Sequence, residues 1–329
     1  MNKFSNTKYL SDSLCKWYLS NKRNLPWRLN QDPYRIWISE VMLQQTTVQA
    51  VIPYFNRFID RFPNVKTLSN APIEEVLKYW SGLGYYSRAR NIHKAAKQFA
   101  VDGFPQSYQK LLDYPGLGPY TARAVSSLAF NEPVGVLDGN VIRILTRFYG
   151  LKIEWWKTIE KIKLQLLSDS LTEFNSPSIV NQATMELGAT ICTPKSPTCT
   201  LCPWMKNCES FSKDLTQILP IAKPRRATEE WSWTPLVLIK KNKIALTRNI
   251  KLPFLKEQLL PPGIGRKLKS KPKKFDFKHN ITHHNIYVEL SKNENINTYE
   301  NLEWIELDHL SEKNPSSLLK KILDAYKIN

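Results

Sequence analysis

Four of the five cysteines lie close together, in the stretch CTPKSPTCTLCPWMKNC. Six, two and five residues separate Cys192, Cys199, Cys202 and Cys208. Four thiolates on one short loop can hold a tetrahedral zinc ion or an iron–sulfur cluster. In a chain of the cytoplasm such a set favours metal ligation over disulfides. The spacing alone leaves zinc and iron–sulfur both open.

Two carboxylates have surroundings that suit them to acid–base chemistry. Glu40 lies in the otherwise apolar stretch ISEVML, where loss of solvent raises the pKa of a carboxyl group and lets it donate a proton. Asp138 precedes Gly139 and Asn140 at the expected start of a helix. Cleaving a glycosidic bond needs a proton donor and a negative charge beside the sugar. Taken alone, a surface helix residue and a helix N-cap are the simpler interpretations of these two positions.

The segment LLDYPGLGPYTARAV, residues 111–125, places a glycine-containing turn between two helical stretches. Gly116 and Gly118 let the backbone approach a phosphate closely, and the next helix turns its N-terminal amides toward that anion. Tyr120 stands directly after the turn. The alternative is a simple turn with no ligand.

Length and charge indicate the number of domains and the kind of partner. A chain of 329 residues exceeds what one hydrophobic core usually serves, so two or three domains are expected. The formal net charge of +18 fits a partner that carries a dense row of phosphates, although it also serves solubility. The most basic run is RKLKSKPKKFDFK (266–278), which fits a solvated loop as well as DNA. We find no apolar run of membrane length and no signal-peptide core, so we expect a cytoplasmic protein without a membrane partner.

Helical patterning dominates up to about residue 210, and strand patterning follows it. Ile92, Ala95, Ala96 and Phe99 share one helical face, and a further helix begins at Pro72. Similar patterns predict helices near 8–21, 33–45, 47–61, 85–100, 106–113, 119–130, 139–149, 155–168 and 177–191. A polar, proline-containing stretch then reads as a linker. Beyond it we expect strands at 235–241, 243–249, 284–290 and 303–307 and a last helix at 316–326.

These motifs together resemble a known family. The cysteine spacing is similar to the loop that holds a [4Fe-4S] cluster in the endonuclease III superfamily of DNA glycosylases. PGLG followed by LDGNV matches the helix-hairpin-helix and aspartate of that superfamily. The stretches LPWR, SEVMLQQT, GLGYYSRARN, VLDGNV and ELGATICT closely resemble the MutY-type adenine DNA glycosylases, over roughly residues 20–210.

The resemblance implies a mainly α fold. It consists of a two-part helix-hairpin-helix core with an iron–sulfur cluster loop, followed by a small α/β Nudix-like domain. We expect the helical region at 1–210, with a six-helix barrel at about 30–136 and a cluster half formed by 1–29 and 137–210. The linker is expected at 211–230 and the Nudix-like, lesion-recognising domain at 231–329.

The resemblance also assigns roles to single residues. Glu40 is the general acid, and Asp138 stabilises the sugar cation or bonds to it transiently; Tyr120 and Asn140 complete the candidate catalytic set. Trp27, Arg28 and Glu186 are expected to line the adenine pocket. Gln45 and Tyr85 are expected to wedge into the duplex. For Trp27 and Tyr85 the alternative is packing in the hydrophobic core. Arg88 and Arg90 reach phosphates or solvate a helix.

The C-terminal segment FKHNITHHNI resembles, more weakly, the loop by which these enzymes read oxidised guanine. It places Thr282 and His283 at the lesion, and Ile281 replaces a family aromatic. The cluster of His279, His283 and His284 is alternatively a metal site, although the sequence shows no acidic or cysteine partner nearby. The Arg-Glu-x-x-Glu-Glu run of pyrophosphohydrolases is absent from the sequence.

The expected partner is therefore duplex DNA with adenine opposite 8-oxoguanine or guanine, bound by a monomer. The resemblance implies a [4Fe-4S] cofactor and a monovalent cation at the hairpin around Gly116 and Gly118. A bifunctional enzyme for oxidised pyrimidines would carry a lysine where this chain has Tyr120. A thymine glycosylase also shares the hairpin, and Glu40 and residues 230–329 argue against it. A non-catalytic DNA-binding module could use the same hairpin, and Glu40 together with Asp138 argues against that interpretation.

Overall fold

The computed structural model describes residues 7–224, 226–291, 301–310 and 316–326. Two compact units divide the chain, Met1–Lys223 and Pro224–Asn329. This boundary lies inside the predicted linker 211–230, of which residue 225 is outside the described residues. Within the described ranges, no helix is both long and apolar enough to cross a membrane.

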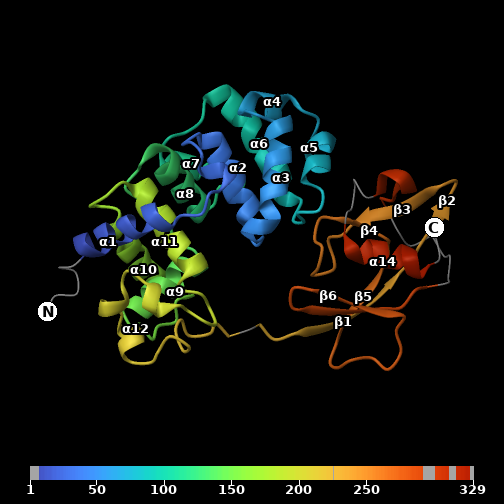
Figure 1. Ribbon diagram of the computed structural model, residues 1–329. Helices are drawn as coiled ribbons and strands as arrows, with labels where there is room; N and C mark the ends of the chain where they lie inside the picture. The colour runs from blue at the N-terminus through green and yellow to red at the C-terminus, as the bar shows by residue number, and fades with distance from the viewer. Residues whose placement is uncertain (1–6, 225, 292–300, 311–315, 327–329) are drawn as a thin grey trace. The chain divides into compact units, whose positions relative to one another are not determined.

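The first unit is built of helices (Figure 1). They are α1 (Thr7–Asn21), α2 (Pro33–Leu43), α3 (Val48–Arg61), α4 (Val65–Asn70), α5 (Ile73–Trp80), α6 (Ser87–Asp102), α7 (Tyr108–Leu111), α8 (Pro119–Phe130), α9 (Gly139–Phe148), α10 (Thr158–Leu171), α11 (Pro177–Thr190) and α12 (Glu209–Ser212). Short 3-10 turns occupy η1 (Pro26–Arg28), η2 (Cys199–Leu201) and η3 (Met205–Asn207). The helix α4 was not among the expected ones, because its six residues are too few for a periodic pattern.

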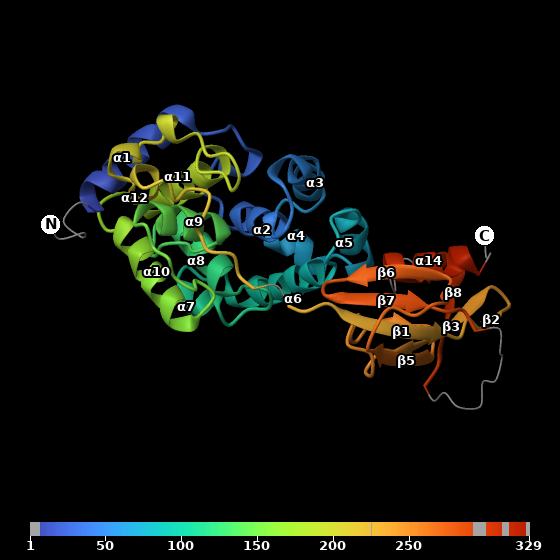
Figure 2. The ribbon, with the colours of Figure 1, turned by 90° about the horizontal axis from the view of Figure 1, so that it is seen from below.

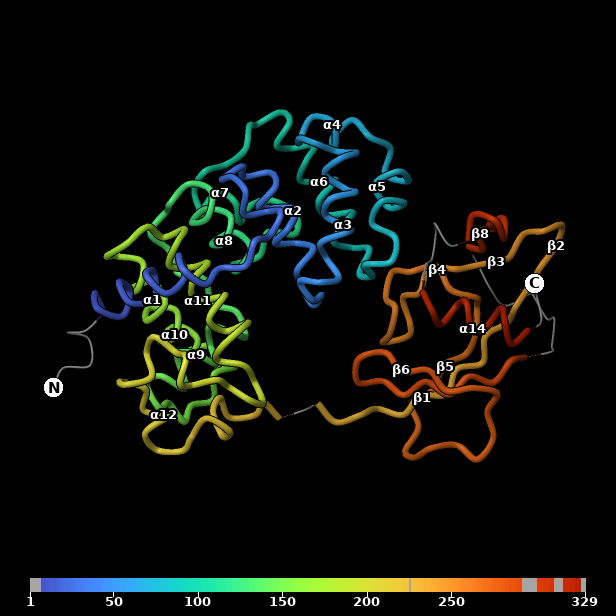
Figure 3. The backbone as a smooth tube through the Cα atoms, in the orientation of Figure 1, coloured from blue at the N-terminus to red at the C-terminus, as the bar shows by residue number. Residues whose placement is uncertain are grey.

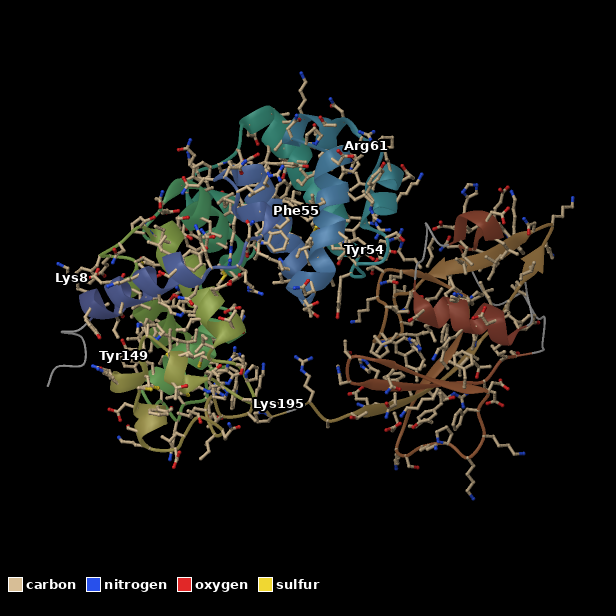
Figure 4. The ribbon with its side chains drawn as sticks, in the orientation of Figure 1. Lys8, Tyr54, Phe55, Arg61, Tyr149 and Lys195 are labelled. Atoms are coloured by element: carbon tan, nitrogen blue, oxygen red, sulfur yellow. The ribbon has the colours of Figure 1, made fainter. Side chains whose placement is uncertain are left out.

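Segments distant in the sequence pack side by side in this unit. The N-terminal helix α1 lies against α10 and α11, as Figure 3 shows, whereas α2 packs on α3 and α8. Phe55 on α3 is fully buried and points toward α2 (Figure 4). Helix α11 contacts both α8 and α9, so it joins the elements that carry Tyr120 and Asp138.

The second unit contains two small sheets and a helix. Its strands are β1 (Glu229–Pro235), β2 (Ile239–Lys240), β3 (Lys243–Arg248), β4 (Leu259–Leu260), β5 (Gly263–Leu268), β6 (Phe277–Ile281), β7 (His284–Val288) and β8 (Glu303–Glu306), followed by the 3-10 turn η4 (Leu307–His309) and by α14 (Ser317–Ala325). One sheet has the order β5-β1-β7-β6, seen in Figure 2, with β1 and β7 parallel; in the other, β3 pairs with β2, β4 and β8.

The strand predictions were partly wrong in this unit. The expected strand 235–241 holds only Pro235, the last residue of β1, and the two residues of β2, with the buried apolar residues 236–238 connecting them. Strands β5 and β6 were not predicted, because the basic run 266–278 includes the end of β5 and the start of β6 and its charged residues obscure the alternating pattern. Lysines and arginines on an edge strand such as β5 discourage pairing with another chain.

Gly135 provides a test of how closely the helical unit packs. A Cβ atom at this position would overlap the Ser168 carbonyl group of α10. We expect Gly135→Ala to lower the free energy of unfolding by about 1 to 3 kcal/mol, because the backbone must shift. Urea unfolding of the full chain measures this value. The matched control is Gly139→Ala, where a Cβ has open space; equal stability of both variants would contradict the packing.

Candidate active site

A cavity of about 590 Å³ opens in the helical unit. Its lining combines acidic, basic and aromatic side chains from α1, η1, α2, α8, α9 and α11, including Trp27, Arg28, Glu40, Tyr120, Asp138, Asn140 and Glu186. The sequence-predicted pocket and catalytic residues of the helical unit are thus brought together around one space. A cavity of this size accommodates a nucleobase that has been rotated out of a DNA duplex.

Glu40 is held in this cavity as a protonatable acid. It lies on α2, whose first turn is capped by the Asp32 side chain, and only 5% of its surface is exposed. Desolvation raises the pKa of Glu40 to about 7, and the nearby Asp138 acts in the same direction. Tyr120 Oη donates a hydrogen bond to Glu40 Oε2 over 2.9 Å, which lowers the pKa in part. The carboxyl group can therefore donate a proton near neutral pH.

Asp138 caps a helix and also lines the cavity. As the N-cap of α9, its Oδ1 accepts a hydrogen bond from the Val141 amide over 2.8 Å. Its Oδ2 accepts a second from Asn140 Nδ2 over 2.9 Å. Burial raises the pKa of Asp138 and these hydrogen bonds oppose the rise. The cap thus fixes a carboxylate at the cavity wall, so capping and catalysis are compatible.

Glu186 has the opposite electrostatic environment. Its side chain is fully buried, which alone would raise its pKa, but Arg23 and Arg28 donate hydrogen bonds to it and lower the pKa to about 2. Arg23 Nε lies 2.7 Å from Oε1, and Arg28 Nη2 lies 2.8 Å from Oε2. Glu186 is therefore ionised throughout the pH range in which Glu40 gains or loses its proton. The sequence analysis missed Arg23, because no pattern links it to a residue on α11.

Trp27 combines both interpretations that the sequence left open. It lines the cavity, yet only 7% of its surface is exposed and its ring meets Phe55 edge to face at 5.4 Å. The ring is thus a fixed wall that belongs to the core as well as to the pocket.

The four cysteines converge as the sequence predicted. They surround a small apolar cavity of about 30 Å³ between the loop and α9, and none of these residues forms a disulfide in the described structure. Arg147 lies beside them, with Nη1 at 3.4 Å from Cys192 Sγ. Four convergent thiols and a nearby cation fit a metal centre or an iron–sulfur cluster.

A chain of hydrogen bonds joins the cysteine loop to the cavity. Arg143 Nε donates to the Cys192 carbonyl over 2.7 Å, and its Nη2 donates to Asn140 Oδ1 over 2.8 Å. Asn140 in turn donates to Asp138. The orientation of the Asp138 carboxylate is thereby coupled to the fold of the loop, through an arginine that the sequence analysis did not single out.

The predicted wedge residues occupy exposed loops. Gln45 follows α2 and Tyr85 precedes α6, and both have left-handed backbone conformations, with φ of 58° and 48°. The Tyr85 side chain is 59% exposed, so it is not a core residue. Left-handed non-glycine residues cost free energy and often occur at functional positions. In the hairpin, Gly116 has φ of 82° and Gly118 is the N-cap residue of α8.

The predicted lesion-reading residues lie on the hairpin between β6 and β7. Thr282 is exposed with φ of 53°, and His283 is next to it. Ile281 packs against the core of the unit. His283 and His284 share a group with Glu229 whose ligand atoms lie within 4.8 Å of one another, and His279 is not part of it. The expectation that no acidic residue lies near these histidines was therefore wrong.

Comparisons with known proteins identify the family of this chain. Residues 38–168 match the family model described as HhH-GPD superfamily base excision DNA repair protein. Adenine DNA glycosylase of Buchnera aphidicola subsp. Baizongia pistaciae is 38% identical over 294 residues, 84% of this chain and 83% of the relative. This chain belongs to the adenine DNA glycosylase family. The human member is 40% identical over 212 residues, 60% of this chain and 38% of its own.

Solved structures support the family's fold. A thermostable thymine-DNA glycosylase has a TM-score of 0.58 and 28% identity, over 63% of this chain and 97% of that one. An endonuclease III–DNA complex has a TM-score of 0.53 and 23% identity, over 65% and 99% of the two chains. The predicted fold class, a helical helix-hairpin-helix core with a small α/β unit, is confirmed.

The Glu186 ion pairs predict a pH-dependent loss of stability. Because the folded pKa of about 2 lies below the ordinary 4.5, the stabilisation is complete above pH 4.5 and is lost as pH falls toward 2. We expect Glu186→Gln to lower the free energy of unfolding by about 3 kcal/mol at neutral pH, since two arginines lose their partner. The difference from the parent protein should shrink in acid.

Urea unfolding at several pH values measures this difference. Glu75→Gln is the control, because Glu75 forms a more exposed pair with Arg61 that contributes little. An equal effect of both substitutions, or a Glu186→Gln effect that grows in acid, would contradict the assignment.

Proposed function

We propose that this chain is a monofunctional adenine DNA glycosylase that acts in base excision repair on adenine paired with 8-oxoguanine or guanine. The observation that carries the proposal is the set of buried Glu40 and half-buried Tyr120 and Asp138 at one cavity. Its family relatives are named as adenine DNA glycosylases. The thymine-DNA glycosylase structure is 28% identical to this chain, less than these relatives, and it supports the fold alone.

The chemistry follows from the two carboxyl groups. Protonated Glu40 donates its proton to a ring nitrogen of the extruded adenine, which makes the base a better leaving group. Asp138, whose two carboxylate oxygens are fixed by hydrogen bonds from Val141 and Asn140, stabilises the positive charge that develops on the sugar. After the base departs, Glu40 as a carboxylate accepts a proton from the attacking water. The products are free adenine and an abasic site in an uncut strand.

Tyr120 supports hydrolysis without strand cleavage. Burial raises the pKa of its hydroxyl well above the usual value, so it remains a neutral hydrogen-bond donor to Glu40. A bifunctional enzyme instead needs a lysine amine that attacks the sugar. Lys22 also lines the cavity, with its ammonium group over the Tyr18 ring, so the absence of strand cleavage has to be measured.

The remaining partners complete the proposal. Duplex DNA is bound by the hairpin at Gly116 and Gly118, together with a monovalent cation, and by Gln45 and Tyr85 as wedges. Trp27, Arg28 and Glu186 border the adenine pocket. Cys192, Cys199, Cys202 and Cys208 hold a [4Fe-4S] cluster, which stabilises the loop contacted by Arg143. The protein acts as a monomer on DNA in the cytoplasm.

We also propose that the second unit reads the base opposite adenine. The exposed Thr282 and the half-buried His283 can donate and accept hydrogen bonds at the tip of their hairpin. Ile281 offers only an aliphatic surface and is packed toward the core, so it replaces the stacking contact of an aromatic residue poorly. Discrimination between 8-oxoguanine and guanine is then carried mainly by polar contacts. The Nudix-like domain is proposed at 231–329 with the linker before it, although β1 already begins at Glu229.

The activity is tested with a labelled duplex that carries adenine opposite 8-oxoguanine. We expect a strand break only after hot alkali, and a rate at least about a hundredfold lower for Glu40→Gln, which cannot donate a proton in the same way. Glu75→Gln is the matched control. Strand cleavage without alkali, trapping of the protein on DNA by borohydride, or preferential excision of thymine from a G:T duplex would contradict the proposal.

The cofactor is tested on the purified protein. We expect a brown solution with a broad visible absorbance band, and loss of that band in Cys202→Ser. Cys15→Ser is the control, because Cys15 is buried in α1 and takes no part in the cysteine loop. A colourless protein with one zinc ion per chain would overturn the iron–sulfur assignment and leave the four cysteines as a zinc site.

A further inference from the structure

Arg88, in the first turn of α6, is a buried arginine with an unusual set of partners. Only 8% of its surface is exposed, and its hydrogen bonds go to backbone carbonyls. The two sequence-based interpretations, a phosphate contact and a solvated helix face, were therefore both wrong for this residue. A guanidinium group buried at such cost calls for another explanation.

The carbonyls that Arg88 contacts belong to two segments, the end of α2 with the loop after it and the loop before α6. Its Nη1 donates to Gln44 O at 2.7 Å and to the end of α2, Val41 O at 2.8 Å and Met42 O at 3.1 Å. Its Nη2 donates to Leu83 O at 3.2 Å and Gly84 O at 3.3 Å. Each contacted loop continues directly into a proposed wedge residue, because Gln45 follows Gln44 and Tyr85 follows Gly84.

The chemistry of the arginine suits this position. The carbonyl end of α2 carries partial negative charge, which offsets the buried positive charge. Burial lowers the pKa of Arg88, but a guanidinium group remains charged. Its centre lies 5.4 Å from the ring centroids of both Trp80 and Tyr85. A lysine has a single ammonium group and cannot extend two separate nitrogen atoms to the two loops.

The same region adjoins the hairpin. A small cavity of about 50 Å³ is lined by Gln44, Arg88, Asn91 and Gly116, among others. Asn91 packs so closely on Gly116 that a Cβ there would lie 2.8 Å from the Asn91 Cβ. The first turns of α6 thus support all three loops that the proposed function places on DNA.

We propose that Arg88 is a positioning residue that fixes the Gln45 loop and the Tyr85 loop relative to each other, so that both side chains enter the duplex as one rigid wedge. This inference rests on the proposed function. Without the arginine, each loop loses its fixed hydrogen-bond donor, and the two left-handed residues relax independently. The consequence is slower extrusion of the adenine, while the chemistry at Glu40 and Asp138 is unchanged.

The test compares Arg88→Lys with Arg57→Lys in the full-length protein. Arg57 also donates to a backbone carbonyl, that of Tyr79, and lies over the Tyr54 ring, but it is exposed and contacts neither wedge loop. Single-turnover excision is measured on the 8-oxoguanine duplex with enzyme in excess. The burst amplitude, measured with substrate in excess, gives the fraction of correctly folded enzyme. We expect a rate about tenfold to a hundredfold lower for Arg88→Lys and an unchanged rate for Arg57→Lys.

Extrusion itself is followed by the fluorescence of 2-aminopurine next to the target adenine, which rises when the bases unstack. Arg88→Lys should reduce the rate of this rise by the same factor as the excision rate. A slower excision with a normal fluorescence change would overturn the positioning role. A fall in burst amplitude with a normal rate would also overturn it, because it would show a purely structural effect.

A double-mutant cycle isolates the pathway of the effect. In a Gln45→Ala, Tyr85→Ala background, Arg88→Lys should change the rate little further, because the side chains that it positions are already absent. Additive effects would contradict the inference. Parent protein that excises no adenine at all would instead refute the proposed function, so the two failures are distinguishable.

Discussion

The hydrogen bond between Tyr120 and Glu40 is the constraint on which the site depends. It joins α8, the helix that starts at the hairpin, to α2, the helix that ends at the Gln45 loop. Glu40 is buried and Tyr120 is half-buried, so the bond forms only if the two helices pack closely together. The same packing that builds the core therefore raises the pKa of Glu40 and connects this residue to the hairpin and to the Gln45 loop.

Two glutamates at one cavity show how packing assigns chemical roles. Glu40 has a hydroxyl group and a second carboxylate as neighbours, and desolvation raises its pKa to about 7. Glu186 has two arginines, which hold its pKa at about 2 despite complete burial. One group can exchange a proton at neutral pH and the other cannot. Opposed environments of this kind distinguish a proton donor from a structural anion.

Arginines organise most of what the motifs leave unexplained. Arg23 and Arg28 fix Glu186, Arg143 connects Asn140 to the cysteine loop, and Arg88 joins the Gln45 loop to the Tyr85 loop. Each donates several directed hydrogen bonds, so each fixes the relative position of segments that are distant in the sequence. In this way the geometry of a reactive cavity is maintained by residues that do not react.

Much of the helical unit was predictable, because apolar periodicity and capping residues are local signals. The expected helix at 33–45, for example, corresponds to α2, and the Asp138 cap was recognised from its neighbours alone. Strands β5 and β6 were missed because their charged residues hide the alternation. The contacts of Arg23 and Arg88 were beyond prediction for another reason: one sequence does not record which distant segments meet. The roles of Gln45 and Tyr85 came from family resemblance, and the structure adds their exposure and backbone conformation.

The central claim is that burial beside Tyr120 sets the proton affinity of Glu40. The most direct measurement is the pH dependence of kcat/KM for adenine excision by the parent protein and by Tyr120→Phe. The active acid is protonated, so the rate should fall as pH rises through about 7. Loss of the Tyr120 hydrogen bond, which lowers the Glu40 pKa, should move this fall to higher pH. An identical profile in both proteins, or a shift to lower pH, would contradict the account.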